Sequence, residues 1–287
     1  MREVITDSKV LIALGAAVGV IAIVLIVCII IRLLREQKGY AIGRTLSAEV
    51  GNAQTIGTRE KQDDSFATTM KEYGIMAIVA DGIGGYINGN LASQITVETF
   101  LDEFEKRDVT ENLSYFFQKS AMLSNERIRD EFGEAKGGTT AVSVILTDDK
   151  LFWTSVGDSN IAVFRGGRII MVNRKENVKN WMEDQYYAGS IRREEALGNQ
   201  KDTRLVNYLG YDGFKKADES DRPIFLKKND KVLLYSDGVE VLGQIELENL
   251  LSKRMHPQKT ADAIISAINM KKKNKKDNAT IVILAIK

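Results

Sequence analysis

Short apolar runs separated by turn-forming residues dominate the chain after residue 50. Runs of this length that are rich in Val, Ile and Leu and bounded by Gly, Asp and Lys are typical of β-strands. Two of the separations, 147–150 (TDDK) and 165–168 (RGGR), are so tight that they predict antiparallel hairpins. The predicted strands are 73–80, 139–146, 151–156, 161–164, 169–172, 231–235 and 280–286.

Apolar residues at helical spacing indicate helices in other parts of the chain. Ile95, Phe100 and Phe104, for example, fall near one face of a helix. The predicted helices are 91–104, 113–132, 247–254 and 260–270. A long helix pair, a series of hairpins, two late helices and a final strand together predict an α+β fold in which helices cover β-sheets.

A third pattern lies near the N-terminus, where residues 10–31 form a 22-residue apolar run without a charged side chain. As a helix, this run would be roughly 33 Å long, and the hydrocarbon core of a bilayer is roughly 30 Å thick. A cleaved signal peptide is the alternative, but its apolar part would be shorter and its basic residues would precede it. We therefore predict one transmembrane helix over residues 10–31.

The charges around this run predict its orientation. Arg32, Arg35 and Lys38 follow the run, whereas the basic residues before it are offset by acidic neighbours. Because basic residues stay on the cytoplasmic side, we expect a single-pass protein of the cell membrane with residues 1–9 outside and the rest in the cytoplasm. The segment 32–48 is then a juxtamembrane linker, and residues 49–287 form one domain.

Composition narrows the classes of function that this domain can have. The formal net charge of +1 gives no reason to expect nucleic acid as a partner. Cys28, the only cysteine, lies in the apolar run, which excludes a cysteine nucleophile in the domain. His256 is the only histidine, so a Ser-His-Asp triad or a His/Cys zinc site has no support. The lysine-rich segment 271–276 is interpreted as a solvated loop, with contact to anionic lipid as the weaker alternative.

Four aspartates lie in short, distinctive settings. Asp81 opens Asp-Gly-Ile-Gly-Gly directly after one predicted strand, and Asp237 is the centre of Ser-Asp-Gly after another. Asp277 begins Asp-Asn-Ala-Thr before the last strand, and Asp64 ends the charged stretch 59–64 (REKQDD). Carboxylates fixed at strand ends without His or Cys favour a site for hard divalent cations such as Mg²⁺ or Mn²⁺.

These four motifs, in this order, resemble those of the metal-dependent serine/threonine protein phosphatase family of type 2C, in its bacterial form. The resemblance covers about residues 50–287 and extends to 137–140 (GGTT), 156–159 (VGDS) and a flap segment at 188–196 (AGSIRREEA). It implies two antiparallel β-sheets packed as a sandwich and flanked by α-helices, in α-β-β-α layers. The flap would set substrate choice by moving.

The resemblance also implies a role for individual residues. The implied ligands of two Mn²⁺ or Mg²⁺ ions are Asp64, Asp81, Gly82 (through its carbonyl oxygen), Asp237 and Asp277. Asp81 would bridge the two ions, and Arg59 would bind the substrate phosphate, so these two residues are the predicted catalytic residues. Asp63 and Asp158 are candidates for a third metal ion or for a metal-held water.

The sequence departs from the family pattern at a few of these positions. Gln62 and Asp63 replace the commoner Asn and Glu, and Asn160 stands where the family usually has Arg. Ile83 stands where eukaryotic members have a histidine thought to act as general acid, whereas bacterial members often have an apolar residue there. Protonation of the leaving group would then have to come from another source.

Together these features predict a membrane-anchored phosphatase that hydrolyses phosphoserine and phosphothreonine by direct attack of a water bridging two divalent metals. Its expected partners are phosphorylated proteins and an opposing serine/threonine kinase. Two alternatives stay open: a catalytically inactive phosphatase-like module that binds or signals, and a metal-dependent phosphatase of a non-protein phosphate ester. The presence of all four aspartates argues against the inactive module.

Overall fold

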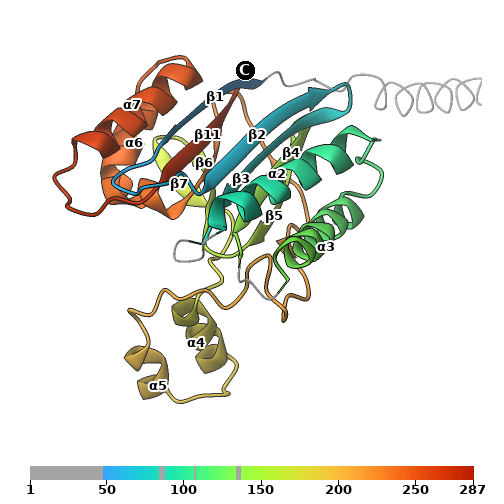
Figure 1. The fold of residues 1–287 in the computed structure, drawn as a ribbon. Coiled ribbons are helices and arrows are strands. Elements are labelled where there is room, and N and C mark those ends of the chain that lie inside the picture. Colours follow the sequence, from blue (N-terminus) through green and yellow to red (C-terminus); the bar gives the residue numbers. More distant parts are fainter. Residues whose placement is uncertain (1–47, 84–87, 107, 134–136) are drawn as a thin grey trace, which may run out of the picture. The chain divides into compact units, whose positions relative to one another are not determined.

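The computed structural model describes residues 48–83, 88–106, 108–133 and 137–287 (Figure 1). The chain separates into two units, Met1–Thr45 and Leu46–Lys287, and the whole description concerns the second. Across the described ranges, none of the helices has the length and apolar character needed to cross a bilayer. The predicted transmembrane helix over residues 10–31 lies outside these ranges, as do residues 1–9 and nearly all of the predicted linker.

The strands of the described residues form two sheets in which all pairings are antiparallel. The first has the order β1-β11-β10-β6-β7, with bounds Ala48–Thr55, Ala279–Ile286, Lys231–Tyr235, Asn160–Arg165 and Arg168–Met171. The second has the order β2-β3-β4-β5-β8, with bounds Asp64–Lys71, Gly74–Asp81, Ala141–Thr147, Lys150–Val156 and Asp218–Glu219. A short strand, β9 (Ile224–Phe225), also pairs with β5.

Alternation along β3 shows why this sheet is covered on both faces. Ile75, Ala77 and Val79 belong to the apolar core between the two sheets, which also includes residues of β10 and β11. Met76 and Ile78 point the other way, into a core shared with helices α2 (Gly89–Glu105) and α3 (Leu113–Phe132). Because successive side chains of a strand point to opposite faces, one continuous apolar run fills two cores.

The other sheet is covered by the late helices. Leu233 and Ile283 pack with residues of the 3₁₀ helix η1 (Asp237–Leu242), α6 (Gln244–Ser252) and α7 (Pro257–Met270). Figure 1 shows α2 and α3 over one sheet and α6 and α7 beside the other. The predicted sandwich of two antiparallel sheets with helices outside is therefore confirmed.

The segment between β7 and β8, which contains two exposed helices, interrupts this sandwich. Helices α4 (Val178–Tyr187) and α5 (Arg193–Gly198) contain no buried residue. Backbone hydrogen bonds close the base of the segment, with Val178 N–H donating to the Arg204 carbonyl at 2.9 Å. The predicted flap, residues 188–196, comprises the turn between the two helices and most of α5.

Candidate functional site

The register of two strands brings the first pair of aspartates together. Asp64 opens β2 and lies directly opposite Asp81, which ends β3. Asp64 is only 4% exposed, and its Oδ2 accepts a hydrogen bond of 2.7 Å from the hydroxyl of Ser236. Its other oxygen, Oδ1, is buried and has no hydrogen-bond partner among the described residues. A buried carboxylate oxygen without a partner is costly, and so it points to a ligand outside the chain.

Burial and mutual repulsion raise the pKa values of these carboxyl groups. Burial is the main cause of a pKa well above the ordinary value at Asp81, and the charges of Asp64, Asp237, Asp158 and Asp277 add to it. Burial likewise raises the pKa of Asp64 to about 6 and that of Asp237 to about 7. The aspartates of five separate motifs therefore interact through their negative charges as one group, which we call the acidic centre (Asp64, Asp81, Asp158, Asp237 and Asp277).

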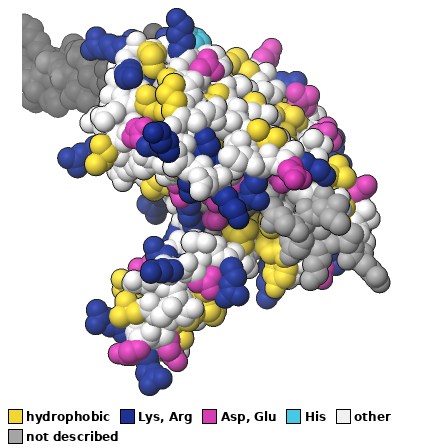
Figure 2. All heavy atoms as spheres, turned by 60° about the vertical axis from the view of Figure 1, so that its left-hand side comes forward, with side chains coloured by type: hydrophobic (Ala, Val, Ile, Leu, Met, Phe, Trp, Pro, Cys, Tyr) yellow, Lys and Arg dark blue, Asp and Glu magenta, His cyan; other side chains and the backbone are white. Residues whose placement is uncertain are grey.

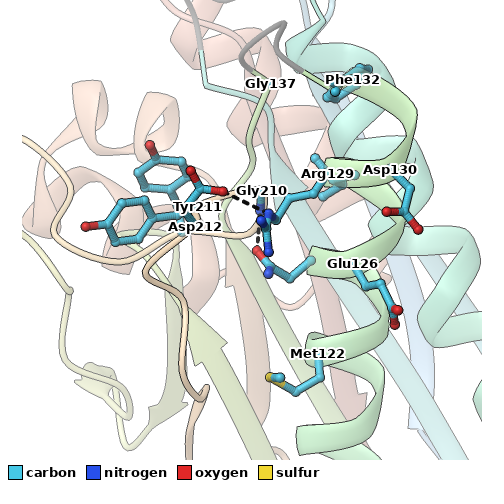
Figure 3. Close-up of a pocket in the computed structure, with 13 residues that line it drawn as sticks. Met122, Glu126, Arg129, Asp130, Phe132, Gly137, Gly210, Tyr211 and Asp212 are labelled. Atoms are coloured by element: carbon cyan, nitrogen blue, oxygen red, sulfur yellow. Dashed lines mark hydrogen bonds and ion pairs between the residues drawn. The ribbon is translucent and has the colours of Figure 1, made fainter.

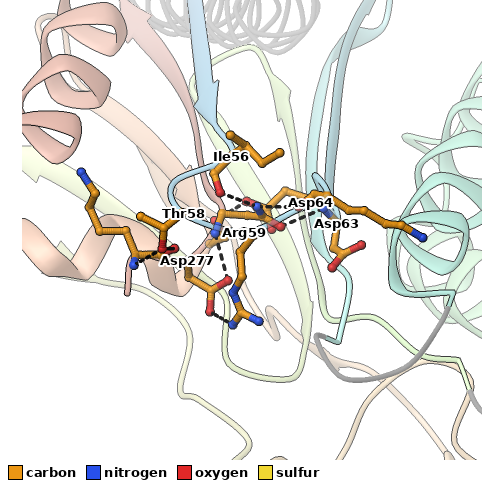
Figure 4. A network of polar contacts seen from close by, with 10 residues as sticks. Ile56, Thr58, Arg59, Asp63, Asp64 and Asp277 are labelled. Atoms are coloured by element: carbon orange, nitrogen blue, oxygen red, sulfur yellow. Dashed lines mark hydrogen bonds and ion pairs between the residues drawn. The ribbon is translucent and has the colours of Figure 1, made fainter. Parts of the chain in front are cut away.

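Asp277 differs from the other members because it is half exposed and paired. Nη2 of Arg59 donates to its Oδ2 at 2.6 Å, as Figure 4 shows. This bond, more than the surrounding charges, raises the pKa of the Arg59 guanidinium. The residue predicted to bind phosphate thus lies against a residue predicted to bind metal.

Asn278, which follows Asp277, fixes the loop that carries Arg59. Its side-chain amide donates to the carbonyls of Ile56 (2.9 Å) and Lys61 (3.0 Å) and accepts from the Asp63 backbone N–H (2.8 Å). At 4% exposed, it joins the segment between β1 and β2 to the start of β11. Sequence reasoning assigned no role to this asparagine. The only available signal was its place in the Asp-Asn dipeptide.

Asp63 has a local structural role. Its carboxylate accepts a hydrogen bond from the backbone N–H of Asn90, in the first turn of α2. A carboxylate at a helix N-terminus satisfies an otherwise unpaired donor and complements the helix dipole. The Asp63 carbonyl also accepts from the Gly82 N–H at 3.1 Å and the Ser93 hydroxyl at 2.6 Å. These bonds connect α2 to the acidic centre.

Two glycines of the motifs are required by close backbone approaches. A Cβ atom on Gly238 would lie 1.9 Å from the carbonyl oxygen of Asn278. A Cβ atom on Gly82 would lie 2.3 Å from the carbonyl oxygen of Gly89. Both glycines therefore let separate segments pack around the acidic centre. Two further glycines of the motif that begins at Asp81, at positions 84 and 85, lie outside the described residues.

Lys175 is a basic residue whose charge acts on Asp158 of the acidic centre, and sequence reasoning missed it. Lys175 opposes the burial that raises the pKa of Asp158, and its Nζ pairs with Glu240 at 2.7 Å. Asn160, which stands where the family usually has Arg, donates to the same Glu240 oxygen at 3.1 Å. The residue that departs from the family pattern, Asn160, therefore has a defined hydrogen-bond partner in the fold.

Glu176, just before α4, connects the base of the segment that contains α4 and α5 to the turn that contains Asp158. Its carboxylate accepts from the Gly157 backbone N–H at 2.8 Å and from the Asn207 side chain at 3.0 Å. Burial raises the pKa of Glu176, while these two donors lower it. Glu176 therefore fixes the base of this segment to the turn beside the acidic centre.

The chemistry of the acidic centre suits hard divalent cations. Its side chains offer only oxygen, the preferred ligand of Mg²⁺ and Mn²⁺, and Asp64 Oδ1 lacks a partner within the described chain. Over the described ranges, no three His, Cys, Asp or Glu side chains are already gathered at the spacing of a metal site. The carboxylates nevertheless lie close enough for their charges to raise one another's pKa values.

One pocket among the described residues gathers four of the predicted site residues, whereas a pocket of about 350 Å³ includes Asp64 alone of that set. The first, of about 910 Å³, is lined by Arg59, Asp63, Asp237 and Asp277. Another pocket, of about 1040 Å³, lies between α3 and residues 208–212 and includes none of the predicted site residues (Figure 3). There Arg129 pairs with Asp212 at 2.9 Å. The pocket of about 910 Å³, which has the most predicted site residues, is therefore the candidate active-site cavity.

Comparison with known proteins gives a consistent result. The sequence model of the family described as protein phosphatase 2C matches residues 53–276. The serine/threonine phosphatase stp of Listeria welshimeri is 24% identical over 217 residues, which are 73% of this chain and 83% of that protein.

Solved structures share the same fold. The S. agalactiae serine/threonine phosphatase superposes with a TM-score of 0.72 at 22% identity, over 84% of this chain and 100% of that one. The catalytic domain of the phosphatase PstP, solved in complex with two manganese ions, gives a TM-score of 0.67 at 19% identity, over 84% of this chain and 99% of that one.

Proposed function

The chain belongs to the protein phosphatase 2C family, and we propose that it is a metal-dependent phosphatase that hydrolyses phosphoserine and phosphothreonine in proteins. The family predicted from the sequence motifs is thereby confirmed. One relative named serine/threonine phosphatase and another named protein phosphatase support the proposed substrate class.

The observation that carries the proposal is the clustering of carboxylates in the acidic centre, where Asp64 is buried and Asp81 and Asp237 are partly buried. Asp64, Asp81 and Asp237 all have raised pKa values, and Asp64 Oδ1 is buried without a partner among the described residues. A folded chain seldom keeps like charges together in its interior unless cations neutralise them. The two manganese ions of the PstP catalytic domain support Mn²⁺ or Mg²⁺ as those cations.

Some residues of the site would bind cations, and another would bind the substrate phosphate. The residues that would hold two cations are Asp64, Asp81, Asp237, Asp277 and the carbonyl of Gly82. When bound, the cations supply Lewis-acid activation of the attacking water and neutralise phosphate charge. Arg59 lines the same pocket, and its bond to Asp277 uses one of five guanidinium donors, so donors remain for phosphate oxygens.

The decisive experiment is hydrolysis of p-nitrophenyl phosphate and a phosphothreonine peptide by the full chain, with and without Mn²⁺. Asp81→Asn removes one carboxylate charge of the acidic centre and should abolish Mn²⁺-dependent turnover. Glu103→Gln removes a buried carboxylate charge elsewhere and should leave turnover unchanged, which makes it the matched control.

Each other outcome favours an alternative. A folded wild-type chain without activity under any divalent cation would exclude the enzyme and favour an inactive binding or signalling module. Hydrolysis of the small ester but not of the peptide would favour a non-protein phosphate ester as substrate. Equal loss in Asp81→Asn and Glu103→Gln would mean that folding, and not the acidic centre, was affected.

We also propose that residues 10–31 anchor the protein in the cell membrane with its catalytic domain in the cytoplasm. The support is the uncharged 22-residue run and the basic residues that follow it. Fractionation of cells that express the full chain, compared with a variant that carries two arginines within the run, tests this anchor. Recovery of both proteins in the soluble fraction would contradict it.

A further inference from the structure

A run of lysines joins α7 to β11 and has no role in the proposed reaction. We call residues 271–276, with the sequence KKKNKK, the lysine loop. Residues 272–275 of this loop are exposed. Figure 2, which brings the α6 and α7 side of Figure 1 forward, shows basic and acidic side chains next to one another on this face. These lysines either lie only in solvent or also line a site that binds a partner.

Part of the lysine loop lines the candidate active-site pocket. Lys273, Lys275 and Lys276 line the pocket of about 910 Å³ together with Arg59 and Asp277. Lys61, from the segment between β1 and β2, lines it as well. Lys272 is exposed on the same loop but is not part of the lining. The loop therefore presents some of its lysines to the reaction site and others to solvent.

Hydrogen bonds hold the lysine loop beside the segment that carries Arg59. The backbone N–H of Lys276 donates to the Thr58 hydroxyl at 2.8 Å, and the Lys276 carbonyl accepts from the Thr58 N–H at 3.0 Å. At the other end of the loop, Lys271 pairs with Glu246. The loop is thus fixed at both ends, so its position relative to Arg59 is set by the fold.

Three of the lysines around the pocket form no ion pair within the described residues, although the charge of Lys61 lowers the pKa of Asp63. Lys276 donates from Nζ to the Asn269 carbonyl at 2.7 Å and so anchors the loop. The ammonium groups of Lys61, Lys273 and Lys275 make no hydrogen bond or ion pair with any residue in the described parts of the chain. These ammonium groups need not be buried in order to bind an anion, because an anion that enters the pocket would displace the water around them.

The acidic residues of the pocket do not cancel these charges evenly. Asp277 is already paired with Arg59, and Glu240 is paired with Lys175. The remaining acids of the lining are Glu60, which is next to Lys61, and Asp63 and Asp237, which lie in or beside the acidic centre and not on the lysine loop. One side of the pocket is therefore carboxylate-rich and suited to cations, while the side formed by the lysine loop is cationic and suited to an anion.

We propose that Lys61, Lys273 and Lys275 form an anion subsite for a carboxylate or a second phosphate on a residue that flanks the phosphoresidue of a protein substrate. This inference rests on the proposed phosphatase function. A flexible peptide can place an acidic side chain inside a concave pocket, among ammonium groups from two chain segments. A bilayer surface would meet the exposed Lys272 as readily as Lys273, so the pocket favours a peptide over lipid.

The test compares three phosphothreonine peptides that differ only at the flanking positions, which carry Glu, phosphoserine or Gln. For the full chain with Mn²⁺, we expect kcat/KM to be about three- to tenfold higher for the Glu and phosphoserine peptides than for the Gln peptide, as weak surface charge pairs permit. The double variant Lys273→Ala/Lys275→Ala should bring this ratio toward one. The control Lys259→Ala/Lys272→Ala removes the same charge outside the pocket and should keep the wild-type ratio.

A second measurement does not depend on turnover. Fluorescence anisotropy with non-hydrolysable phosphonate versions of the peptides should show the same preference in affinity, and 0.5 M salt should weaken it, because exposed charges are screened. Failure of p-nitrophenyl phosphate hydrolysis would refute the proposed function, and the anisotropy data would then still decide the subsite.

Three results would overturn the subsite. Equal affinity and turnover for all peptides would show that the pocket does not read flanking charge. Equal losses in the two double variants would assign any preference to overall charge. Binding of phosphatidylserine vesicles that depends on Lys273 and Lys275, without any peptide preference, would assign the lysine loop to a lipid surface.

Discussion

Glu103 and Asp64 are both almost completely buried acids, 5% and 4% exposed, but their surroundings are opposite. Glu103, on α2, accepts from Lys106 at 2.8 Å and from Lys119 at 2.6 Å, and these bonds lower its pKa. Asp64 has one hydroxyl donor, one unpartnered oxygen and a raised pKa. The fold can therefore supply counter-ions to a buried carboxylate, but it does not supply one to Asp64.

This contrast shows where stability and function conflict. At Glu103 the chain provides both charges of an ion pair, so the pair needs nothing from solution. At the acidic centre the chain provides mainly the negative charges, which cost stability unless ions from solution bind. Sites that violate the rules of stable burial are the places where function is expected.

The largest effect that would test this contrast is on catalysis. We expect Asp237→Asn to lower Mn²⁺-dependent kcat/KM by about a hundredfold to a thousandfold, the usual range for loss of a preorganised electrostatic group. In EDTA the same variant should be as stable as the wild type or more stable, because one repelling buried charge is gone. Steady-state kinetics and urea denaturation measure the two quantities. A variant that is inactive and also less stable in EDTA would contradict the contrast.

The second effect is on stability and depends on cations. At a Mn²⁺ concentration one hundred times the dissociation constant, the free energy of unfolding should increase by about 2.7 kcal/mol. Asp81→Asn should lose most of this increase, whereas Glu103→Gln should keep it. Thermal denaturation with Mn²⁺ and with EDTA provides the comparison, and an equal Mn²⁺ response in Asp81→Asn would place the binding site elsewhere.

The third effect is a loss of stability, in contrast to Asp237→Asn, when the charge of the paired acid Glu103 is removed. Glu103→Gln removes a charge that two ammonium groups bind, so we expect it to destabilise the protein by about 1–3 kcal/mol, with or without Mn²⁺. Its kcat/KM should equal that of the wild type, since Glu103 lies outside the candidate pocket. Chemical denaturation of both proteins checks the value. A neutral or stabilising result would show that the lysines contribute little.

The smallest effect, taken for one group and one pH unit, is a pH dependence of opposite sign in the two regions. Raised pKa values mean that the folded acidic centre binds more protons than the unfolded chain between the ordinary aspartate pKa of 3.8 and about 7. In EDTA, stability should therefore fall as pH rises through this window, by about 1.4 kcal/mol per pH unit at most for each proton. Glu103, with its lowered pKa, loses its contribution as pH falls below the ordinary glutamate value. Urea denaturation across pH 4–8 for the wild type and Asp237→Asn separates the two contributions.

Much of the fold could be predicted because its central elements are apolar throughout. The predicted helix 113–132 has the observed bounds of α3, and the strand predicted at 231–235 has those of β10. Strands β1 and β2 were not predicted, since only one residue of each is buried and their sequences are largely polar. Helix α4 was not predicted because none of its residues is buried, so no apolar spacing marks it.

The candidate site was predicted in its composition but not in its contacts. Short motifs beside apolar strands were sufficient to select Asp81, Asp237 and Asp277, whereas Asp64 was selected through the resemblance of the charged stretch 59–64 to a family motif. The pairing of Arg59 with Asp277 and the three hydrogen bonds of Asn278 join segments from opposite ends of the domain, so no local pattern contains them. The metal-binding and phosphate-binding roles themselves stay predictions until the variants are measured.

The position of β11 has a consequence for how the protein is made. This strand lies between β1 and β10, and Asp277 and Asn278 immediately precede it. While a ribosome is still synthesising residues 277–286, β1 and β10 lack their common neighbour, and the loop with Arg59 lacks its anchor. Domains tend to fold as units once their long-range pairings can form. A nascent chain would therefore remain inert toward phosphoproteins around the ribosome until this last part of the domain has emerged.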